Sequence, residues 1–259
     1  FDSTGIIAGI EPYSKDVLSR LHNLKVISRA GVGIDNIDLD YAKKKGIKIF
    51  NTPNVVIRPV VELAIAMIYD LLRKITFHTA LIKEGKWKKL VGNTIYKKNI
   101  GIIGTGRIGK ALAETLMKLD ANIIAYDIYR DEEWAKKNKI KYLTLTNLLR
   151  NSDIISIHAS GLKSKSAIID KSQFNEMKKG AILINTSRGT NLNEKELVKN
   201  LENGKLAGFG SDVFINEPYS GDLTKFNNVV LTPHIATFTV ESRNQMEIEA
   251  TKNLLNNLI

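Results

Sequence analysis

The chain contains no cysteine, which excludes disulfide bonds, thiolate metal sites and cysteine nucleophiles. Histidine is also scarce: four occur among 259 residues, and no two have the spacing of a metal-ligand pair. The longest apolar stretch, residues 60–69, is interrupted by Glu62 and is too short to cross a bilayer. The sequence therefore predicts a soluble, cytoplasmic protein with no bound metal and no membrane partner.

Acidic residues are outnumbered, because 38 lysines and arginines face 27 aspartates and glutamates, a net charge of +11. Such an excess is typical of nucleic-acid-binding proteins. Here, however, the lysines are spread along the chain with acids among them, and no nucleic-acid-binding motif accompanies them. We expect no nucleic-acid partner, and an anionic small substrate and cofactor account for part of the excess.

Strand and helix patterns alternate from end to end, which is typical of parallel sheets. Short apolar runs predict ten strands, at 5–8, 25–28, 47–50, 100–103, 122–126, 141–143, 154–158, 181–185, 206–212 and 228–232. Helices are predicted at 14–21, 39–45, 59–73 and 240–258, among others. The chain opens at Phe1, almost inside a strand and without a methionine, so we expect N-terminal sequence to be missing.

A glycine-rich turn lies between a short buried strand and an amphipathic helix, and it consists of Gly104, Thr105, Gly106, Arg107, Ile108 and Gly109. Gly104 allows the tight turn, Gly106 lets the backbone approach a pyrophosphate, and Gly109 lets the helix lie close to the strand. The N–H groups at the start of the helix, where Arg107 and Ile108 stand, face the phosphates. The context of the turn, rather than the glycines alone, predicts a dinucleotide site.

Asp127 follows the apolar run 123–126, at the distance from Gly109 that is typical of a ribose-binding acid. A carboxylate there accepts hydrogen bonds from the ribose 2′-OH and repels a 2′-phosphate, which favours NAD over NADP. Arg130 follows shortly and would tolerate some NADP, but we expect Asp127 to dominate. The predicted cofactor is therefore NAD.

Three polar residues come shortly after predicted strands: Arg188, Glu217 and His234. Ligands of open parallel sheets bind beyond the carboxyl ends of the strands, so we expect these three on one rim. Alone, each has a plain structural interpretation, as a helix-end cation, a surface acid and a structural histidine. Together on one rim they favour catalysis.

These residue types suit the oxidation of a 2-hydroxy acid, which requires a base, a cation and a nicotinamide that takes the hydride. His234 is the candidate base, or the acid in the reverse direction, because imidazole titrates near neutrality. Glu217 would orient its ring and stabilise its charged form. Arg188 would hold the substrate carboxylate and polarise the carbonyl.

The segments that carry these residues, 181–196, 210–218 and 232–236, resemble the D-isomer-specific 2-hydroxyacid dehydrogenases. Further similarity lies in 28–36 and 51–53, so the resemblance covers nearly the whole chain. It implies an α/β fold with two domains. A doubly wound parallel sheet of the Rossmann type would form the dinucleotide-binding domain, and a smaller flavodoxin-like domain would bind the substrate.

We place the substrate domain at residues 1–53 and 235–259, and the dinucleotide-binding domain at 54–234. The resemblance implies the catalytic roles given above for the rim residues, and adds Thr186 and Asp212 as cofactor-binding residues, with Asp212 on the nicotinamide amide. It also implies a substrate-binding loop whose backbone N–H groups meet the substrate carboxylate and which consists of Arg29, Ala30, Gly31, Val32 and Gly33. Finally, it implies a homodimer built through the helix at 59–73 and the arm around Trp87.

The identity of the substrate is less constrained. Arg29 before the substrate loop resembles the 3-phosphoglycerate dehydrogenase branch, whereas Ala8-Gly9-Ile10 departs from the Arg-Ser of that branch. We expect 3-phosphoglycerate and phosphohydroxypyruvate first among the candidates, then hydroxypyruvate or glyoxylate. The alternative is a corepressor-type protein of the same family, which senses NADH and turns over little substrate.

Overall fold

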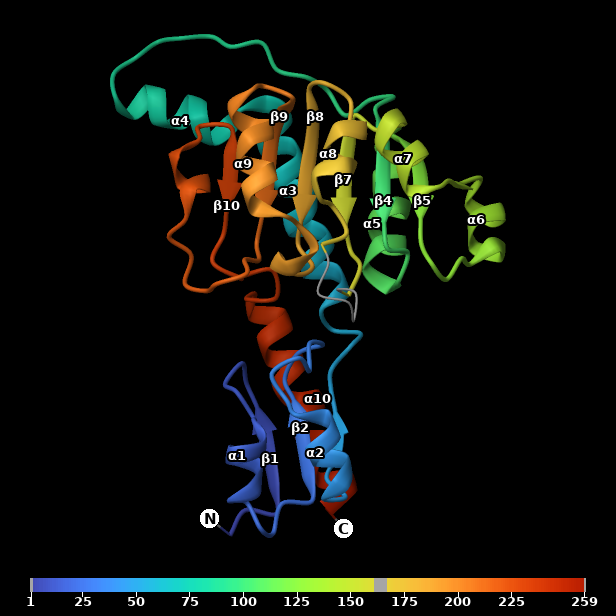
Figure 1. Ribbon diagram of the computed structural model, residues 1–259, viewed down its shortest axis with the longest axis vertical. Coiled ribbons are helices and arrows are strands. Elements are labelled where there is room, and N and C mark those ends of the chain that lie inside the picture. Colours follow the sequence, from blue (N-terminus) through green and yellow to red (C-terminus); the bar gives the residue numbers. More distant parts are fainter. Residues whose placement is uncertain (1, 161–166, 259) are drawn as a thin grey trace. The chain divides into compact units, whose positions relative to one another are not determined.

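The computed structural model describes residues 2–160 and 167–258, which form two compact units. Unit 1 combines the residues up to Pro59 with those from Ala236 onward, and unit 2 comprises Val60–Ile235. In Figure 1, unit 1 contains the blue elements and the red terminal helix. The two ends of the chain therefore fold into the same unit.

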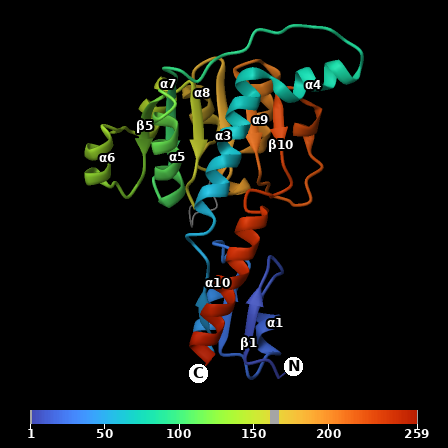
Figure 2. The same ribbon diagram turned by 180° about the vertical axis from the view of Figure 1, so that it is seen from behind.

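Unit 1 is built on a three-stranded parallel sheet with the order β1-β2-β3. Its elements are β1 (Gly5–Ala8), α1 (Lys15–Ser19), β2 (Val26–Arg29), α2 (Leu39–Lys44), β3 (Lys48–Phe50) and α10 (Val240–Leu258). The last helix packs against all three strands, on the face opposite to α1 and α2 (Figures 1 and 2). Gly5 admits this contact, because a Cβ there would lie 2.7 Å from the Leu254 side chain.

Both short helices of unit 1 begin at a side-chain cap. Ser14 accepts a hydrogen bond from the N–H of Val17, and Asp38 accepts one from the N–H of Tyr41 at 2.9 Å. The helix predicted at 14–21 is shorter than expected. It ends at Ser19, because the next N–H groups bond to carbonyls three residues back and so tighten the chain into a turn.

Unit 2 is built on a seven-stranded sheet of order β10-β9-β8-β7-β4-β5-β6, with every neighbouring pair parallel. Its strands are β4 (Asn99–Ile103), β5 (Asn122–Tyr126), β6 (Lys141–Tyr142), β7 (Ile154–Ile157), β8 (Ala181–Asn185), β9 (Leu206–Ser211) and β10 (Val229–Leu231). The chain winds outward from β4 to β6, then returns to β7 and winds outward the other way. This reversal confirms the predicted doubly wound fold and places a ligand-binding switch point between β4 and β7.

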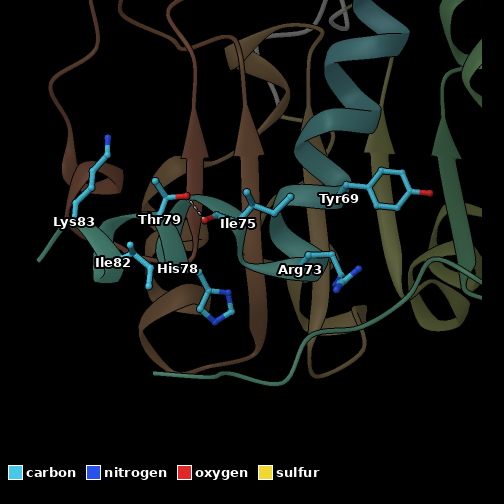
Figure 3. Close-up of a pocket in the computed structure, with 7 residues that line it drawn as sticks. All are labelled: Tyr69, Arg73, Ile75, His78, Thr79, Ile82 and Lys83. Atoms are coloured by element: carbon cyan, nitrogen blue, oxygen red, sulfur yellow. Dashed lines mark hydrogen bonds between the residues drawn. The ribbon is translucent and has the colours of Figure 1, made fainter. Parts of the chain in front are cut away.

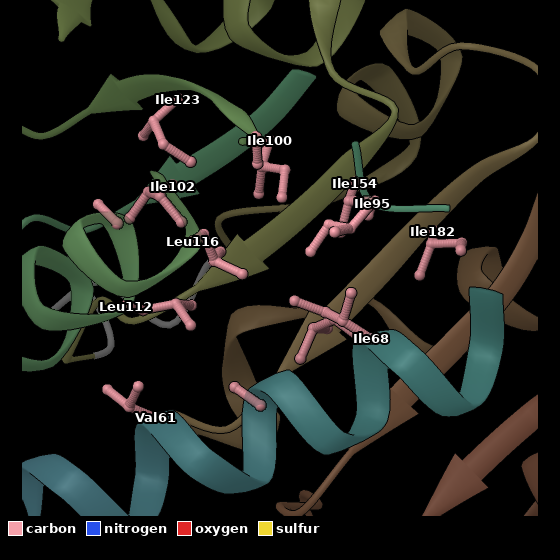
Figure 4. Packing of buried hydrophobic residues seen from close by; sticks show 14 of the residues in the cluster. Val61, Ile68, Ile95, Ile100, Ile102, Leu112, Leu116, Ile123, Ile154 and Ile182 are labelled. Carbon is pink, nitrogen blue, oxygen red and sulfur yellow. The ribbon is translucent and has the colours of Figure 1, made fainter. Parts of the chain in front are cut away.

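Helices cover both faces of this sheet. One face carries α3 (Ile57–Arg73) and α5 (Arg107–Met117), and the other carries α7 (Leu145–Asn151), α8 (Lys171–Glu176) and α9 (Glu194–Glu202), as Figures 1 and 2 show. Side chains such as Ile68, Ile102 and Leu112 join α3, β4 and α5 in a buried apolar cluster (Figure 4). Because β4 is buried on both faces, its sequence is a nearly unbroken apolar run. The connecting helix begins at Ile57 rather than at the predicted Pro59, which occupies its first turn.

The end of α3 and the following α4 (Ile75–Lys83) border a surface hollow of about 710 Å³. Figure 3 shows it on the side from which the strand arrows point away, so it lies at the amino ends of the strands. The segment 84–94, here called the arm, folds back on these helices. The N–H of Leu90 donates to His78 Nε2 at 3.2 Å, and that of Asn93 donates to the carbonyl of Leu72 at 2.8 Å.

Within the described ranges, no helix is both long and apolar enough to span a membrane. Likewise, outside the gap at 161–166 and the chain ends, no group of three or more histidine, aspartate or glutamate side chains is placed to hold a metal ion.

Candidate active site

The glycine turn lies between β4 and α5, at the switch point of the sheet. Gly104 has a φ of 92°, and a Cβ there would lie 2.6 Å from the backbone nitrogen of Ala159. A Cβ on Gly109 would lie 2.0 Å from the carbonyl oxygen of Gly104, so α5 reaches the turn only with glycine at this position. By contrast, apart from its chain neighbours, no atom of the described residues lies within 4 Å of a Cβ on Gly106, so they leave open space there.

Two observations show that these residues fit a dinucleotide. The open space over Gly106 lies at the N-terminal end of α5, because Gly106 is the N-cap residue and has no side chain to cover the first N–H groups of the helix. At the carboxyl end of β8, the buried Thr186 Oγ1 makes no hydrogen bond within the described residues. A buried hydroxyl without a partner is costly, and a cofactor amide at that place would satisfy it.

Asp127 follows β5 and lies next to the turn. Its Oδ2 accepts hydrogen bonds from the N–H of Thr105 at 2.6 Å and from the Thr105 hydroxyl at 3.1 Å. Its Oδ1 accepts one from the N–H of Tyr129 at 2.9 Å. The carboxylate is thus fixed at the position where a ribose-binding acid stands in this fold.

The carboxyl edge of β8 carries Arg188. The buried Asn185 holds this loop, because its Oδ1 accepts from the Ser187 hydroxyl at 2.7 Å and its Nδ2 donates to the Arg188 carbonyl at 2.9 Å. The Arg188 side chain in turn donates to the Ser187 carbonyl at 2.7 Å. The guanidinium is therefore placed by a rigid turn.

His234 and Glu217 form a hydrogen-bonded pair, with His234 Nδ1 2.8 Å from Glu217 Oε2. The other oxygen of Glu217 accepts from the N–H of Phe214 at 2.9 Å. An ionised carboxylate only accepts, so in this pair Nδ1 is the donor and Nε2 is the ring nitrogen left to face a ligand. The side chains of His234 and Glu217 are 52% and 38% exposed, so the pair is open to small molecules.

Asp212 is fully buried at the end of β9 and holds the segment that carries His234. Its Oδ1 accepts hydrogen bonds from the Thr232 hydroxyl at 2.5 Å and from the N–H of Ile235 at 2.8 Å. His234 lies between these two bonds, with a left-handed φ of 55°. Asp212 therefore bonds to a side chain before and to the backbone after a residue that adopts an unfavourable conformation.

Gly189 connects the two loops of the site, a role that the sequence does not reveal. A Cβ at Gly189 would lie 2.1 Å from the carbonyl carbon of Phe214 and 2.4 Å from the nitrogen of Ile215. The turn after Arg188 thus rests directly on the backbone that holds Glu217. This contact joins residues that are distant in the chain, so the sequence signal was limited to a glycine next to Arg188.

A second histidine stands on the same rim and differs in its chemistry. His158 follows β7, and its Nε2 lies 2.8 Å from the Ser156 hydroxyl. Burial lowers the pKa of His158 to about 4, so this ring is neutral above that pH. His158 is therefore a structural partner of the strand, whereas His234 is the accessible ring.

The predicted substrate loop belongs to unit 1 and follows β2. The N–H of Ala30 donates to the Ala8 carbonyl at 3.0 Å, and that of Gly31 donates to the Thr52 hydroxyl at 2.9 Å and the Arg29 carbonyl at 3.0 Å. These two groups are therefore engaged within the protein. The N–H groups of Val32 and Gly33 make no hydrogen bond to the described residues, and they are the donors that the loop offers.

Comparisons with known proteins agree with this geometry. The family model for the NAD-binding domain of D-isomer-specific 2-hydroxyacid dehydrogenases matches residues 65–236. A glyoxylate reductase from Thermofilum pendens is 41% identical over 93% of this chain and 74% of its own length. A hydroxypyruvate reductase from Thermotoga maritima is 36% identical over 98% of this chain and 84% of its own. A D-lactate dehydrogenase from Aquifex aeolicus, solved with NAD and lactic acid, superposes with a TM-score of 0.89 at 30% identity, covering 97% of this chain and 81% of its own.

The contact of Gly189 with Phe214 predicts the effect of Gly189→Ala. The added methyl group must displace the backbone that holds Glu217, and misplacing a catalytic group by about 1 Å costs on the order of 100-fold in rate. We expect kcat to fall about 10- to 100-fold while the Kd for NADH, measured by fluorescence titration, is unchanged.

Gly101→Ala is the matched control. A Cβ there would lie 2.3 Å from the Ser152 hydroxyl inside the core, away from both catalytic loops. We expect this variant to lower Tm and leave kcat unchanged. Equal kcat losses in the two variants would assign the effect of Gly189→Ala to general destabilisation.

Proposed function

Because the chain belongs to the D-isomer-specific 2-hydroxyacid dehydrogenase family, we propose that it reduces glyoxylate or hydroxypyruvate with NADH and catalyses the reverse oxidation. It is an NAD-dependent dehydrogenase of small 2-hydroxy acids. The observation that carries the proposal is the accessible His234–Glu217 pair on the same carboxyl edge as Arg188. The names of the two relatives supply the substrates.

In the proposed reaction, His234 Nε2 donates a proton to the carbonyl oxygen of the 2-oxo acid. Glu217 keeps the ring oriented and stabilises its protonated form through the Nδ1–H bond. Arg188 binds the substrate carboxylate and polarises the carbonyl group. Bound NADH supplies the hydride that reaches the carbonyl carbon. In the oxidative direction, His234 accepts the hydroxyl proton.

The residues that would hold NADH follow from the same geometry. The turn of Gly104 to Gly109 would bind the pyrophosphate with the N-terminal end of α5, and Asp127 would bind the ribose hydroxyls. Thr186 Oγ1 and Asp212 would bind the nicotinamide end. In unit 1, the N–H groups of Val32 and Gly33 would bind the substrate carboxylate.

The surroundings of Arg29 support a substrate without a phosphate. Glu11 accepts hydrogen bonds from the Tyr13 hydroxyl and from the N–H of Gly9. These bonds, with a smaller contribution from the Arg29 charge, lower the pKa of Glu11, so its carboxylate is ionised near neutrality. The Arg29 charge makes the smallest of these contributions, so Glu11 offsets part of it. A dianionic phosphoryl group would be attracted less strongly by Arg29 beside Glu11 than by an isolated arginine. Glyoxylate and hydroxypyruvate carry no second anionic group and do not depend on this attraction.

The substrate is tested by NADH consumption with a panel of 2-oxo acids that includes glyoxylate, hydroxypyruvate, pyruvate and phosphohydroxypyruvate. We expect the highest kcat/KM for glyoxylate or hydroxypyruvate. Glu11→Gln removes one negative charge, whose repulsion of a nearby phosphoryl group is on the order of 1 kcal/mol in water. This variant should therefore raise kcat/KM for phosphohydroxypyruvate roughly fivefold and leave kcat/KM for glyoxylate unchanged. The highest kcat/KM on phosphohydroxypyruvate would restore the 3-phosphoglycerate assignment, and NADH binding without turnover would identify a sensor.

His234→Ala tests the proton transfer. A positioned general acid contributes about 10²- to 10⁴-fold, so kcat should fall by that factor while the Kd for NADH is unchanged. His22→Ala, which removes an exposed histidine of unit 1, is the control and should keep full activity. Loss of NADH binding in His234→Ala would show that the ring holds the cofactor rather than the proton.

We further propose that the protein is a homodimer built through α3, α4 and the arm. Several large apolar side chains of this region are exposed among exposed lysines, with Ile82 54%, Trp87 83% and Val91 91% exposed. Ile82 lines the hollow in Figure 3, and Trp87 and Val91 lie in the arm that follows α4. Exposed apolar side chains that occur together in one region mark a candidate interaction surface.

A charge at the centre of this surface should separate the copies. In size-exclusion chromatography with light scattering, we expect the wild type at twice the mass of the chain and Ile82→Asp at the mass of one chain. Ile248→Asp is the control, since Ile248 is an equally exposed isoleucine on α10 in unit 1. A monomeric wild type would refute the proposed dimer.

A further inference from the structure

We propose that Tyr142 and Thr105 are positioning residues for Asp127, and that they set how strongly the nucleotide site prefers NADH to NADPH. The inference rests on the proposed role of Asp127 at the ribose. It adds a residue on β6, two strands away from the glycine turn, to the determinants of cofactor choice.

The hydrogen bonds between these residues have a defined direction. The N–H of Asp131 donates to the Tyr142 oxygen at 3.2 Å, and the Tyr142 oxygen lies 2.7 Å from Thr105 Oγ1. Thr105 Oγ1 lies 3.1 Å from Asp127 Oδ2, which as a carboxylate oxygen only accepts. The Thr105 proton is therefore committed to Asp127, and the Tyr142 proton is committed to Thr105.

This chain of bonds acts on the charge of Asp127. Each hydrogen bond in a series polarises the next, so the Tyr142 hydroxyl strengthens the bond from Thr105 to the carboxylate. Thr105 is buried, and its N–H and hydroxyl both donate to the same oxygen of Asp127. Three donors in all, including the Tyr129 N–H, fix the plane of the carboxylate and leave one lone pair, on Oδ1, for a ribose hydroxyl.

The ring of Tyr142 contacts the basic residue of this region. The guanidinium carbon of Arg130 lies 5.8 Å from the centre of the Tyr142 ring, a cation–π distance. Arg130 is the cation that would attract a 2′-phosphate. Through its hydroxyl, Tyr142 thus supports Asp127, the acid that selects NADH. Through its ring, it contacts Arg130, the cation that would favour NADPH. The two effects are separable, because phenylalanine retains the ring alone.

The test measures Kd for NADH and for NADPH by fluorescence titration of the whole protein, and KM and kcat with the 2-oxo acid that is turned over fastest. In Tyr142→Phe, losing one hydrogen bond of the chain should weaken NADH about three- to tenfold, with kcat and the Kd for NADPH unchanged. The preference for NADH falls by the same factor. Thr105→Val should have an equal or larger effect, because it removes the bond to Asp127 itself.

The double variant Thr105→Val/Tyr142→Phe distinguishes a relay from independent effects. In a relay, Tyr142→Phe adds nothing once Thr105 is valine. A further loss of NADH preference in the double variant would refute the relay.

Tyr219→Phe is the matched control. The Tyr219 hydroxyl donates to Glu194 at 2.6 Å and accepts the N–H of Leu223 at 3.2 Å, so like the Tyr142 hydroxyl it has one side-chain acceptor and one backbone donor, at a site away from the glycine turn. We expect this variant to lower Tm about as much as Tyr142→Phe without changing the ratio of the two Kd values. An unchanged ratio in Tyr142→Phe as well would make Tyr142 a structural residue.

Asp127→Ala separates failure of this inference from failure of the proposed role of Asp127 in cofactor choice. If Asp127→Ala leaves the ratio of the Kd values unchanged, Asp127 does not select the cofactor, and both statements fall. If Asp127→Ala reduces the ratio and Tyr142→Phe does not, the role of Asp127 stands and the role of Tyr142 is refuted.

Discussion

The parallel hydrogen bonding of the seven-stranded sheet is the constraint on which the rest of unit 2 depends. Since all strands run the same way, all their carboxyl ends meet at one edge. Helices must cover both faces, so the strand interiors are apolar and polar side chains are confined to the segments that follow the strands. Chemistry is thereby concentrated along one rim, and the reversal between β4 and β7 gives the nucleotide its place.

This constraint also explains what could be predicted. The strands were found because doubly buried strands are unbroken apolar runs, and Arg188 was a candidate because it follows such a run. The contact between Gly189 and Phe214 and the bond between Thr105 and Tyr142 were beyond the sequence, because they join residues whose spacing carries no period or motif. Helix ends were imprecise for a related reason, as at Ser19, where competing backbone bonds decide the last turn.

The side chains proposed for catalysis are held by both backbone and side-chain groups. Phe214 fixes one oxygen of Glu217 through its N–H, while Asp212 accepts from the Thr232 hydroxyl and the Ile235 N–H on the two sides of His234. Backbone donors cost no side-chain entropy when they bind, so the pair is ordered although it is open to small molecules. An exposed site with fixed geometry is what a reaction with a small substrate requires, since the substrate itself makes few contacts.

The net charge of the chain and the individual charges at the candidate site have different effects on anionic ligands. The chain carries a net charge of +11, yet three of the groups proposed to define the chemistry are acids, at Asp127, Asp212 and Glu217. A basic excess raises the local concentration of an anionic substrate and cofactor over the entire surface, but it does not discriminate among anions. Discrimination needs a negative charge at a defined position, where it repels a second phosphate or stabilises one imidazolium. In a basic protein each such acid needs hydrogen-bond donors to hold it in place, and Thr105 for Asp127 and Phe214 for Glu217 supply them.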